Sequence, residues 1–380
     1  MTTSRDVILH LSLLDGVGPV TIEKIVHVLD QQRAWDRVYE FSVQDFQHTC
    51  HLSPAIAHTV VDGLARYEIV AREKALLVQH AFSWATVYDQ EYPPLLRHIH
   101  APPAVLYWQG NGALLQEAAL ACIGSRHANY YGQRVIKMII PELVQAGWVI
   151  VSGGARGADG YAHQATLDAG GKTVVVLGSG LLKPYPAEHG RLFDAICAQG
   201  GAIISSFGVQ TTPVPGNFPA RNRIIAGLSR GCIVVQAAAK SGTQSTAQHA
   251  LEQGKDVFAI PGPIDDPLSE GCHALIQQGA KLAQSAQDII SELSGTIVQK
   301  KNKEPAKRDI QKDEHDQKTH HENGVPSLTD TILMHCARPC SWDDLLETMQ
   351  IDLPSLQALL LQLQIAGKVQ QDMSGKWVSV

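Results

Sequence analysis

The sequence lacks the features that mark a secreted or membrane-spanning protein. Its seven cysteines form no CxxC pair, and Cys122 and Cys232 stand inside apolar runs, which favours reduced thiols over a disulfide framework or a zinc site. No uninterrupted apolar run approaches the roughly 18 residues that a membrane helix needs, and the first residues do not have the pattern of a signal peptide. We therefore expect a soluble cytoplasmic protein that has no membrane partner and no metal site.

The chain also lacks an excess of positive charge, since its formal net charge is −6. Taken alone, this value argues against a nucleic-acid partner. The balance varies along the chain: residues 1–100 carry 8 Lys and Arg against 12 Asp and Glu, residues 101–293 carry 13 against 13, and residues 328–380 carry 3 against 6. Any site for a polyanion should therefore be a local patch in the middle of the chain.

The first 80 residues predict a small helical domain. Leu13–Pro19 is a glycine-containing turn ahead of a helix over Thr21–Leu29, and the arrangement resembles a helix-hairpin-helix or SAM-like domain. In helix-hairpin-helix proteins the hairpin amides hold a DNA phosphate. Here Asp15 and Glu23 make the surroundings acidic, so a purely structural hairpin fits equally well.

Residues 81–293 predict a doubly wound parallel α/β sheet. Six apolar runs alternate with amphipathic stretches, as expected for buried parallel strands joined by helices. A proline-punctuated segment that ends in a further strand, Ala101–Trp108, should cover one edge of this core. The six runs are Leu120–Ile123, Trp148–Val151, Thr173–Leu177, Ala202–Ser205, Gly231–Val235 and Asp256–Ile260.

The loops after these strands are rich in Gly, Ser, Arg and Lys. Small residues let backbone amides approach an anion, basic side chains supply charge, and the carboxyl ends of parallel strands meet at one edge of a sheet. We expect the first amides of the helix after the first strand to face the same crevice. The predicted phosphate-binding residues are Gly124, Ser125, Arg126, Ser152, Gly153, Gly154, Arg156, Gly157, Phe218, Arg221, Asn222, Arg223, Lys240, Ser241, Gly242 and Thr243.

Two side-chain roles within this set follow from position. Arg221 and Arg223 lie two residues apart at a helix start and cannot point the same way, so one should bind and the other should hold structure. Tyr130 or Phe218 could stack on bases, although both could equally belong to the core.

The loops that follow the six predicted strands, in their order along the chain, closely resemble those of the DNA-processing DprA family, also called Smf. The resemblance covers about residues 88–293. It implies an extended Rossmann-like domain that binds single-stranded DNA without a cofactor, forms a homodimer through that domain, and loads RecA recombinase in natural transformation. The segments that carry it are Ile123–Arg126, Val151–Asp159, Ala162–His163, Val176–Gly180, Tyr185–Pro186, Phe218–Ser229, Lys240–Thr243 and Val257–Gly262.

Departures from the family bear on catalysis. Ser206 and Gln236 stand where relatives often have Glu, which leaves Asp159 as the main acidic residue of the rim. A single carboxylate is rarely sufficient for acid–base catalysis, which uses a positioned acid and a positioned base. Asp159 is better explained as a helix cap. We therefore predict that the chain is not an enzyme.

The principal alternative is a nucleotide-processing enzyme similar to the lysine-decarboxylase-like phosphoribohydrolases. Those enzymes use a Gly-rich loop followed by a catalytic Glu. The comparable loop here is Lys240–Thr246, and the first carboxylate after it is Glu252. A nicotinamide dehydrogenase fits less well, because the first loop is not GxGxxG.

The C-terminal part predicts a flexible linker over 294–327 and a winged-helix-like domain over 328–380. The linker is rich in charged residues and has almost no large apolar ones. The domain should have helices over Leu328–Cys336, Trp342–Met349 and Pro354–Ala366 and a hairpin over Val369–Val380. The third helix carries no Lys or Arg, so a protein contact is favoured over DNA reading.

Overall fold

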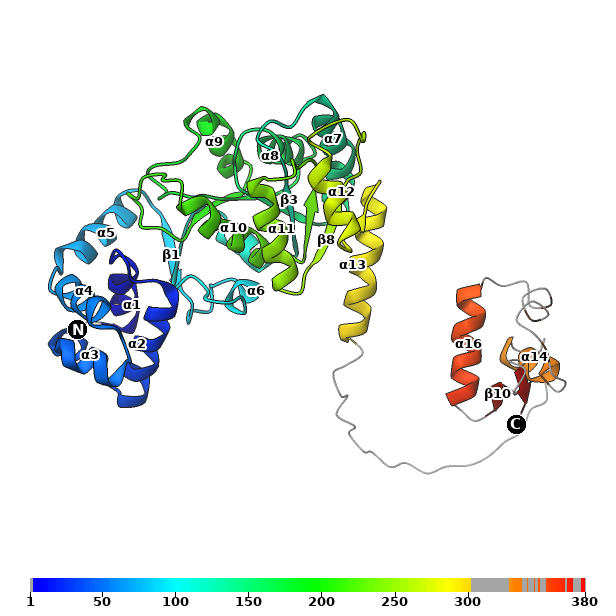
Figure 1. Ribbon diagram of the computed structural model, residues 1–380, viewed down its shortest axis with the longest axis horizontal. Helices are drawn as coiled ribbons and strands as arrows, with labels where there is room; N and C mark the ends of the chain where they lie inside the picture. Colours follow the sequence, from blue (N-terminus) through cyan, green and yellow to red (C-terminus); the bar gives the residue numbers. More distant parts are fainter. Residues whose placement is uncertain are drawn as a thin grey trace, which may run out of the picture. The chain divides into compact units, whose positions relative to one another are not determined.

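The structure is a computed structural model of the 380-residue chain. It describes residues 3–301, 328–336, 340, 345, 348, 353–365, 368–371 and 377–379. The chain divides into two compact units, Met1–Pro305 and Ala306–Val380, and each is described by itself (Figure 1).

Five helices form the first part of the larger unit. Thr3 and Ser42 close capping boxes at two of their starts, and Pro54 occupies the first turn of a third, so local sequence explains where these helices begin. The helices are α1 (Ser4–Ser12), α2 (Pro19–Gln32), α3 (Val43–Thr49), α4 (Pro54–Leu64) and α5 (Glu68–Gln79). The predicted helical content of residues 1–80 is present, whereas the helix-hairpin-helix or SAM-like character stays a prediction.

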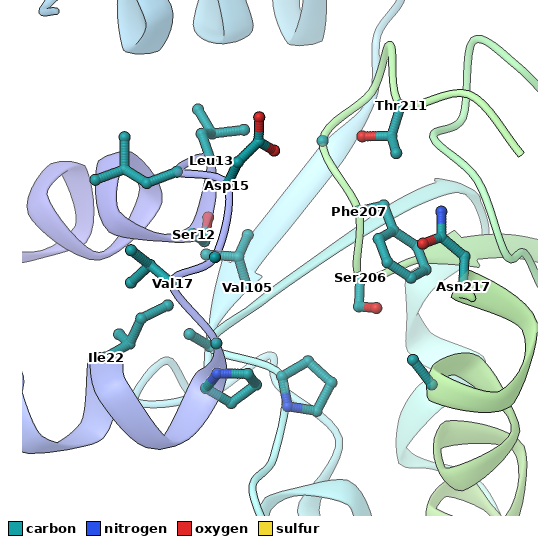
Figure 2. Close-up of a pocket in the computed structure, with 18 of the residues that line it drawn as sticks. Ser12, Leu13, Asp15, Val17, Ile22, Val105, Ser206, Phe207, Thr211 and Asn217 are labelled. Atoms are coloured by element: carbon teal, nitrogen blue, oxygen red, sulfur yellow. The ribbon is translucent and has the colours of Figure 1, made fainter. Parts of the chain in front are cut away.

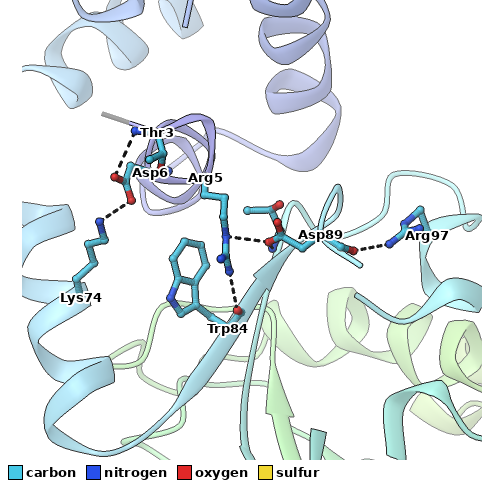
Figure 3. Close-up of polar contacts among 8 residues, drawn as sticks. Thr3, Arg5, Asp6, Lys74, Trp84, Asp89 and Arg97 are labelled. Carbon is cyan, nitrogen blue, oxygen red and sulfur yellow. Dashed lines mark hydrogen bonds and ion pairs between the residues drawn. The ribbon is translucent and has the colours of Figure 1, made fainter. Parts of the chain in front are cut away.

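Helices α1 and α5 are tied to the sheet through polar contacts. Arg5 forms an ion pair with Asp89 at 3.0 Å and donates to the Trp84 carbonyl, as Figure 3 shows. On α5, the buried Glu73 carboxylate accepts the Val209 N–H at 2.7 Å, and burial raises the pKa of Glu73. The N-terminal helices and this edge of the sheet share one hydrophobic core.

The sheet of the larger unit has nine strands in the described residues, in the order β1-β2-β6-β5-β4-β3-β7-β8-β9. The six predicted strands are all present and all parallel, while β2 pairs antiparallel with β6 and β1 antiparallel with β2. The strands are β1 (Ser83–Thr86), β2 (Val105–Gly110), β3 (Ala119–Ile123), β4 (Val149–Ser152), β5 (Thr173–Val176), β6 (Ala202–Ser205), β7 (Gly231–Val234), β8 (Asp256–Ala259) and β9 (Lys281–Leu282).

Helices cover both faces of this sheet (Figure 1). Alternate strand residues point to opposite faces, so on β3 Ala121 and Ile123 belong to one core and Leu120 and Cys122 to the other. The first face carries α6 (Pro94–Arg97), α10 (Asn217–Leu228), α11 (Gly242–Glu252) and α12 (Glu270–Gln277). The second carries α7 (Tyr130–Gln145), α8 (Ala158–Asp168), α9 (Gly190–Ala198) and α13 (Ala286–Lys301). The predicted doubly wound, Rossmann-like α/β fold is confirmed.

The strand order places a switch point beside β3. The chain runs outward from β3 through β4 and β5 to β6 and then returns to β7 on the other side of β3. Loops that leave neighbouring strands in opposite directions open a crevice at their carboxyl ends. The loops after β3 and β7 therefore border the position where this fold binds ligands.

The C-terminal unit is described in part. It contains α14 (Leu328–His335), α16 (Leu353–Ile365) and an antiparallel hairpin of β10 (Val369–Gln371) and β11 (Trp377–Ser379). Most of the predicted helix over 342–349 lies outside the described residues, so the winged-helix domain stays a prediction. The predicted linker begins within α13, which continues to Lys301, and 302–327 lie outside the described residues. Of the helices that the structure describes, none combines the length and apolar composition that crossing a membrane requires.

Candidate functional site

A groove of about 700 Å³ lies at the carboxyl ends of β3 and β7. The loops after β3 and β7 and the start of α10 form its walls, as the strand pattern predicts. The predicted residues that line it are Gly124, Ser125, Arg126, Phe218, Arg221, Asn222, Lys240, Ser241, Gly242 and Thr243. A smaller adjoining cavity adds Gly153 and Arg156.

Arg126 is an accessible cation of this groove. Its side chain is exposed, and among the side chains that the structure describes it has no ion-pair partner. The guanidinium carbon lies 5.3 Å from the centre of the Phe218 ring, a distance at which the ring holds a cation by its quadrupole. The guanidinium is thus oriented at the groove and keeps its donors free for an anion.

The loop after β7 gives the groove a helix start without a cap. Helix α11 begins after Ser241 with no side-chain hydrogen bond to its first amides. The Gln244 N–H donates to the Ser241 carbonyl at 3.2 Å, which leaves the N–H groups of Gly242 and Thr243 without an acceptor among the described residues. The buried Ser241 Oγ has no hydrogen-bond partner among the described residues. Together with the exposed Lys240, these donors form a ready site for a phosphate oxygen.

The start of α7 does not supply the free amides that we expected there. The Asn129 carboxamide accepts the N–H groups of Tyr131 and Gly132 at 2.9 and 3.3 Å. The Gln236 carboxamide accepts the Asn129 N–H at 3.1 Å, and the Ser125 N–H donates to the Gln236 carbonyl. The prediction is therefore wrong for this helix, because the neighbouring Asn129 side chain caps its first amides and Gln236 binds two amides of the loop before it.

The loop after β4 is likewise closed from within. The Asp159 carboxylate accepts the N–H groups of Gly153 and Ala155 at 3.1 and 3.2 Å. It thus holds the loop that precedes α8 rather than capping the helix. Burial raises the pKa of Asp159, and the charge of nearby Arg221 opposes that rise. A buried carboxylate bound to two amides is a structural group with no free access to a substrate.

Arg221 lies under the groove rather than on its surface. Its side chain is 4% exposed and donates to the carbonyl oxygens of Gly153 and Val176. Burial lowers its pKa to about 10, so the guanidinium is still charged at neutral pH. Arg221 therefore joins the ends of β4 and β5 and adds positive potential beneath the groove.

Gly157 lets two of these loops approach each other. It has a φ of +71°, and a Cβ atom there would collide with the carbonyl groups of Ser125 and Arg126. We expect Gly157→Ala to lower the free energy of unfolding by roughly 1–3 kcal/mol and to displace Arg126. Urea unfolding and an oligonucleotide titration check both effects, with Gly170→Ala as the control, because Gly170 also has a positive φ but open space around it.

In addition to Arg221, four predicted residues do not present free binding groups. Ser152 is buried and donates to the Cys122 carbonyl, and Gly154 packs against Val175. Arg156 is exposed but forms an ion pair with Glu188, and this hydrogen bond lowers the pKa of Glu188. The fourth is Arg223, which lies outside the groove and donates to the carbonyls of His100 and Ala101.

Arg223 belongs to a second cavity of about 470 Å³ on the other side of α10. Figure 2 shows Ser12, at the end of α1, and Asp15 and Val17, in the turn after it, on one side of this cavity and Thr211 and Asn217 on the other. Ser206 also lines this cavity. The sequence could not separate the two arginines, but the structure assigns them to different cavities.

Tyr185 lines the groove but is not among the residues predicted for the site. It is 40% exposed, and its ring centre lies 5.7 Å from that of Phe218. An aromatic residue in a loop carries no periodic signal, so only its place in the Tyr185–Pro186 motif could have indicated it. Tyr130 is 77% exposed and is not among the residues that line the groove.

Comparison with known proteins agrees with this architecture. The family model for DNA recombination-mediator protein A matches residues 83–294. Protein Smf of Escherichia coli is 46% identical over 202 residues, which cover 53% of this chain and 54% of that protein, so the match spans about half of that relative's length. DNA processing protein DprA of Streptococcus pneumoniae is 45% identical over 54% of this chain and 73% of that protein.

The solved structures that are similar to the chain include those of two DNA processing proteins. DNA processing protein A of Streptococcus pneumoniae has a TM-score of 0.66 and 36% identity, covering 77% of this chain and 99% of that one. DNA processing protein A of Helicobacter pylori, whose structure was described for its single-stranded DNA binding mode, has a TM-score of 0.51 and 31% identity, covering 57% and 97%. The family model covers more than half of the sequence, and the chain therefore belongs to the DNA recombination-mediator protein A family.

Proposed function

We propose that the chain binds single-stranded DNA in the groove, protects incoming DNA, and loads a RecA recombinase onto it during homologous recombination or natural transformation. One observation carries the DNA-binding step: Arg126, Lys240, the unpartnered Ser241 Oγ and the uncapped start of α11 line the same groove. Their donors suit phosphate oxygens, which carry no sequence information. Membership of a recombination-mediator family supports the role in loading a recombinase.

The enzymatic alternative finds less support. Among the described residues that line the groove, Asp159 is the only acidic one, and its carboxylate is bound to two backbone amides. Glu252 stands at the last turn of α11 and bonds with Gln248 and His249, away from the loop where phosphoribohydrolases need their carboxylate. We therefore favour a binding protein over a hydrolase.

Strand selectivity tests the proposal. We expect the full chain to bind a labelled oligothymidylate at least about tenfold more tightly than a duplex of the same length, because a flexible single strand can bring both its phosphates and its bases into the groove. Competition measured by fluorescence anisotropy checks this. Equal affinity for both forms would refute the assignment.

We also propose that the chain forms a homodimer through the sheet-containing unit. The apolar residues Ile224, Ile225 and Leu228 on α10 are at most 5% exposed and belong to the core, so they are not available for this contact. Leu282, 48% exposed on the edge strand β9, offers a surface instead, because an open edge can pair with another chain.

Light scattering tests the dimer. A chain that ends at Lys301 should remain dimeric, and Leu282→Asp should make it monomeric. Leu251→Asp is the matched control, since Leu251 is 44% exposed but lies on α11. A monomeric wild type, or a dimer that tolerates Leu282→Asp, would contradict this placement.

A further inference from the structure

Tyr185 and Phe218 form an aromatic pair at the groove, and the two rings are engaged differently. The Phe218 ring lies against the backbone of Gly178, where a Cβ atom would meet it at 2.9 Å. The guanidinium groups of Arg126 and Arg221 lie 5.3 and 5.9 Å from its centre. Much of the Phe218 ring is therefore in contact with other residues of the protein. Because it contacts the Arg126 guanidinium, Phe218 acts as a residue that positions Arg126.

Tyr185, in contrast, keeps much of its surface open to the groove. Its side chain is 40% exposed, and the two rings are inclined at 59° with centres 5.7 Å apart. The residue lines both the main groove and the adjoining cavity, where Arg126 and Arg156 are its neighbours. A ring with one side supported by Phe218 and another open beside a free cation is arranged to receive a flat group attached to an anion.

We infer that Tyr185 forms a stacking subsite for a nucleobase of the strand whose phosphate binds Arg126. This inference rests on the proposed binding of single-stranded DNA. Every base has a π face, so stacking adds affinity without reading sequence. The phosphate contacts and the stacking contact can be measured separately. An abasic strand keeps the phosphates and lacks the bases, so it retains the phosphate contacts and loses the stacking contact.

The test compares an oligothymidylate with an abasic strand of equal length, using the full chain. We expect Tyr185→Ala to weaken binding of the oligothymidylate about tenfold and binding of the abasic strand less than about twofold, while Tyr185→Phe keeps wild-type affinity for both. Arg126→Ala should weaken binding of both strands. Equal losses on the two strands for Tyr185→Ala, or no loss on either, would overturn the stacking role.

Tyr130→Ala is the matched control, because Tyr130 is a more exposed tyrosine that does not line the groove. We expect Tyr130→Ala to bind both strands like the wild type. If it weakens binding of the oligothymidylate more than Tyr185→Ala does, the stacking residue is Tyr130 on α7 and the inference is wrong. Circular dichroism melting verifies that each variant is folded. A wild type that binds neither strand would refute the proposed function itself, which is distinct from a wild type whose binding does not depend on Tyr185.

Discussion

Replacing Arg126 by alanine should weaken binding of single-stranded DNA about ten- to a hundredfold. Arg126 has no ion-pair partner among the described side chains, and its guanidinium is oriented by the Phe218 ring, so the variant loses a charge-assisted contact to phosphate. Such a contact contributes roughly 1.5–3 kcal/mol. Fluorescence anisotropy on a labelled oligonucleotide measures the loss, and circular dichroism verifies folding.

Two comparisons make this result specific. Arg134→Ala removes another exposed arginine, on α7, that does not line the groove, and it should change affinity less than about threefold. Deleting residues 328–380, which carry 3 basic against 6 acidic residues, should have an equally small effect. If the deletion is more damaging than Arg126→Ala, the C-terminal part of the chain binds the DNA.

Arg221→Ala should lower the free energy of unfolding by roughly 3–5 kcal/mol, because it leaves a buried carboxylate without its compensating charge. Arg221 is 4% exposed and Asp159 is 8% exposed, and both groups lie against Gly153. The carbonyls of Gly153 and Val176 would lose their donor as well. Urea unfolding monitored by circular dichroism gives the measurement.

The double variant Arg221→Ala, Asp159→Asn distinguishes this cause from a loss of packing. Removing the carboxylate charge should recover part of the stability, so the two losses should not add. Arg223→Ala is a matched control at a partly exposed arginine that donates only to loop carbonyls, and it should cost less. A loss below about 1 kcal/mol for Arg221→Ala, or strict additivity, would contradict the proposed coupling.

The sequence predicted the sheet well because buried parallel strands leave a strong pattern. Each of the six apolar runs became a strand, and their order explains why the loops after β3 and β7 meet. Ten of the predicted residues line one groove because they follow strands whose carboxyl ends share an edge. Strands β1 and β9 were not predicted, since four and two residues at the sheet margin give little periodic signal.

Hydrogen bonds between distant residues could not be predicted in the same way. The N–H group of Asn129, just before α7, donates to the Gln236 carboxamide, and Gln236 lies in the loop after β7, 107 residues away. Asp159 closes the amides of the preceding loop, so loops with suitable composition hold fewer free donors than their sequences indicate. Arg221 and Arg223 point to opposite sides of α10, as their spacing required, but only the structure identifies the carbonyls that each one binds.

The salt dependence of binding tests the central claim, that phosphates are held in this groove, most directly. Arg126 and Lys240 are cations at the groove without an ion-pair partner among the described side chains, and each phosphate contact on a single strand contributes about −0.7 to the slope of log K against log salt concentration. The wild type should therefore give a slope of about −1.4 and Arg126→Ala about −0.7. A slope that is near zero in the wild type, or unchanged by the substitution, would contradict the account.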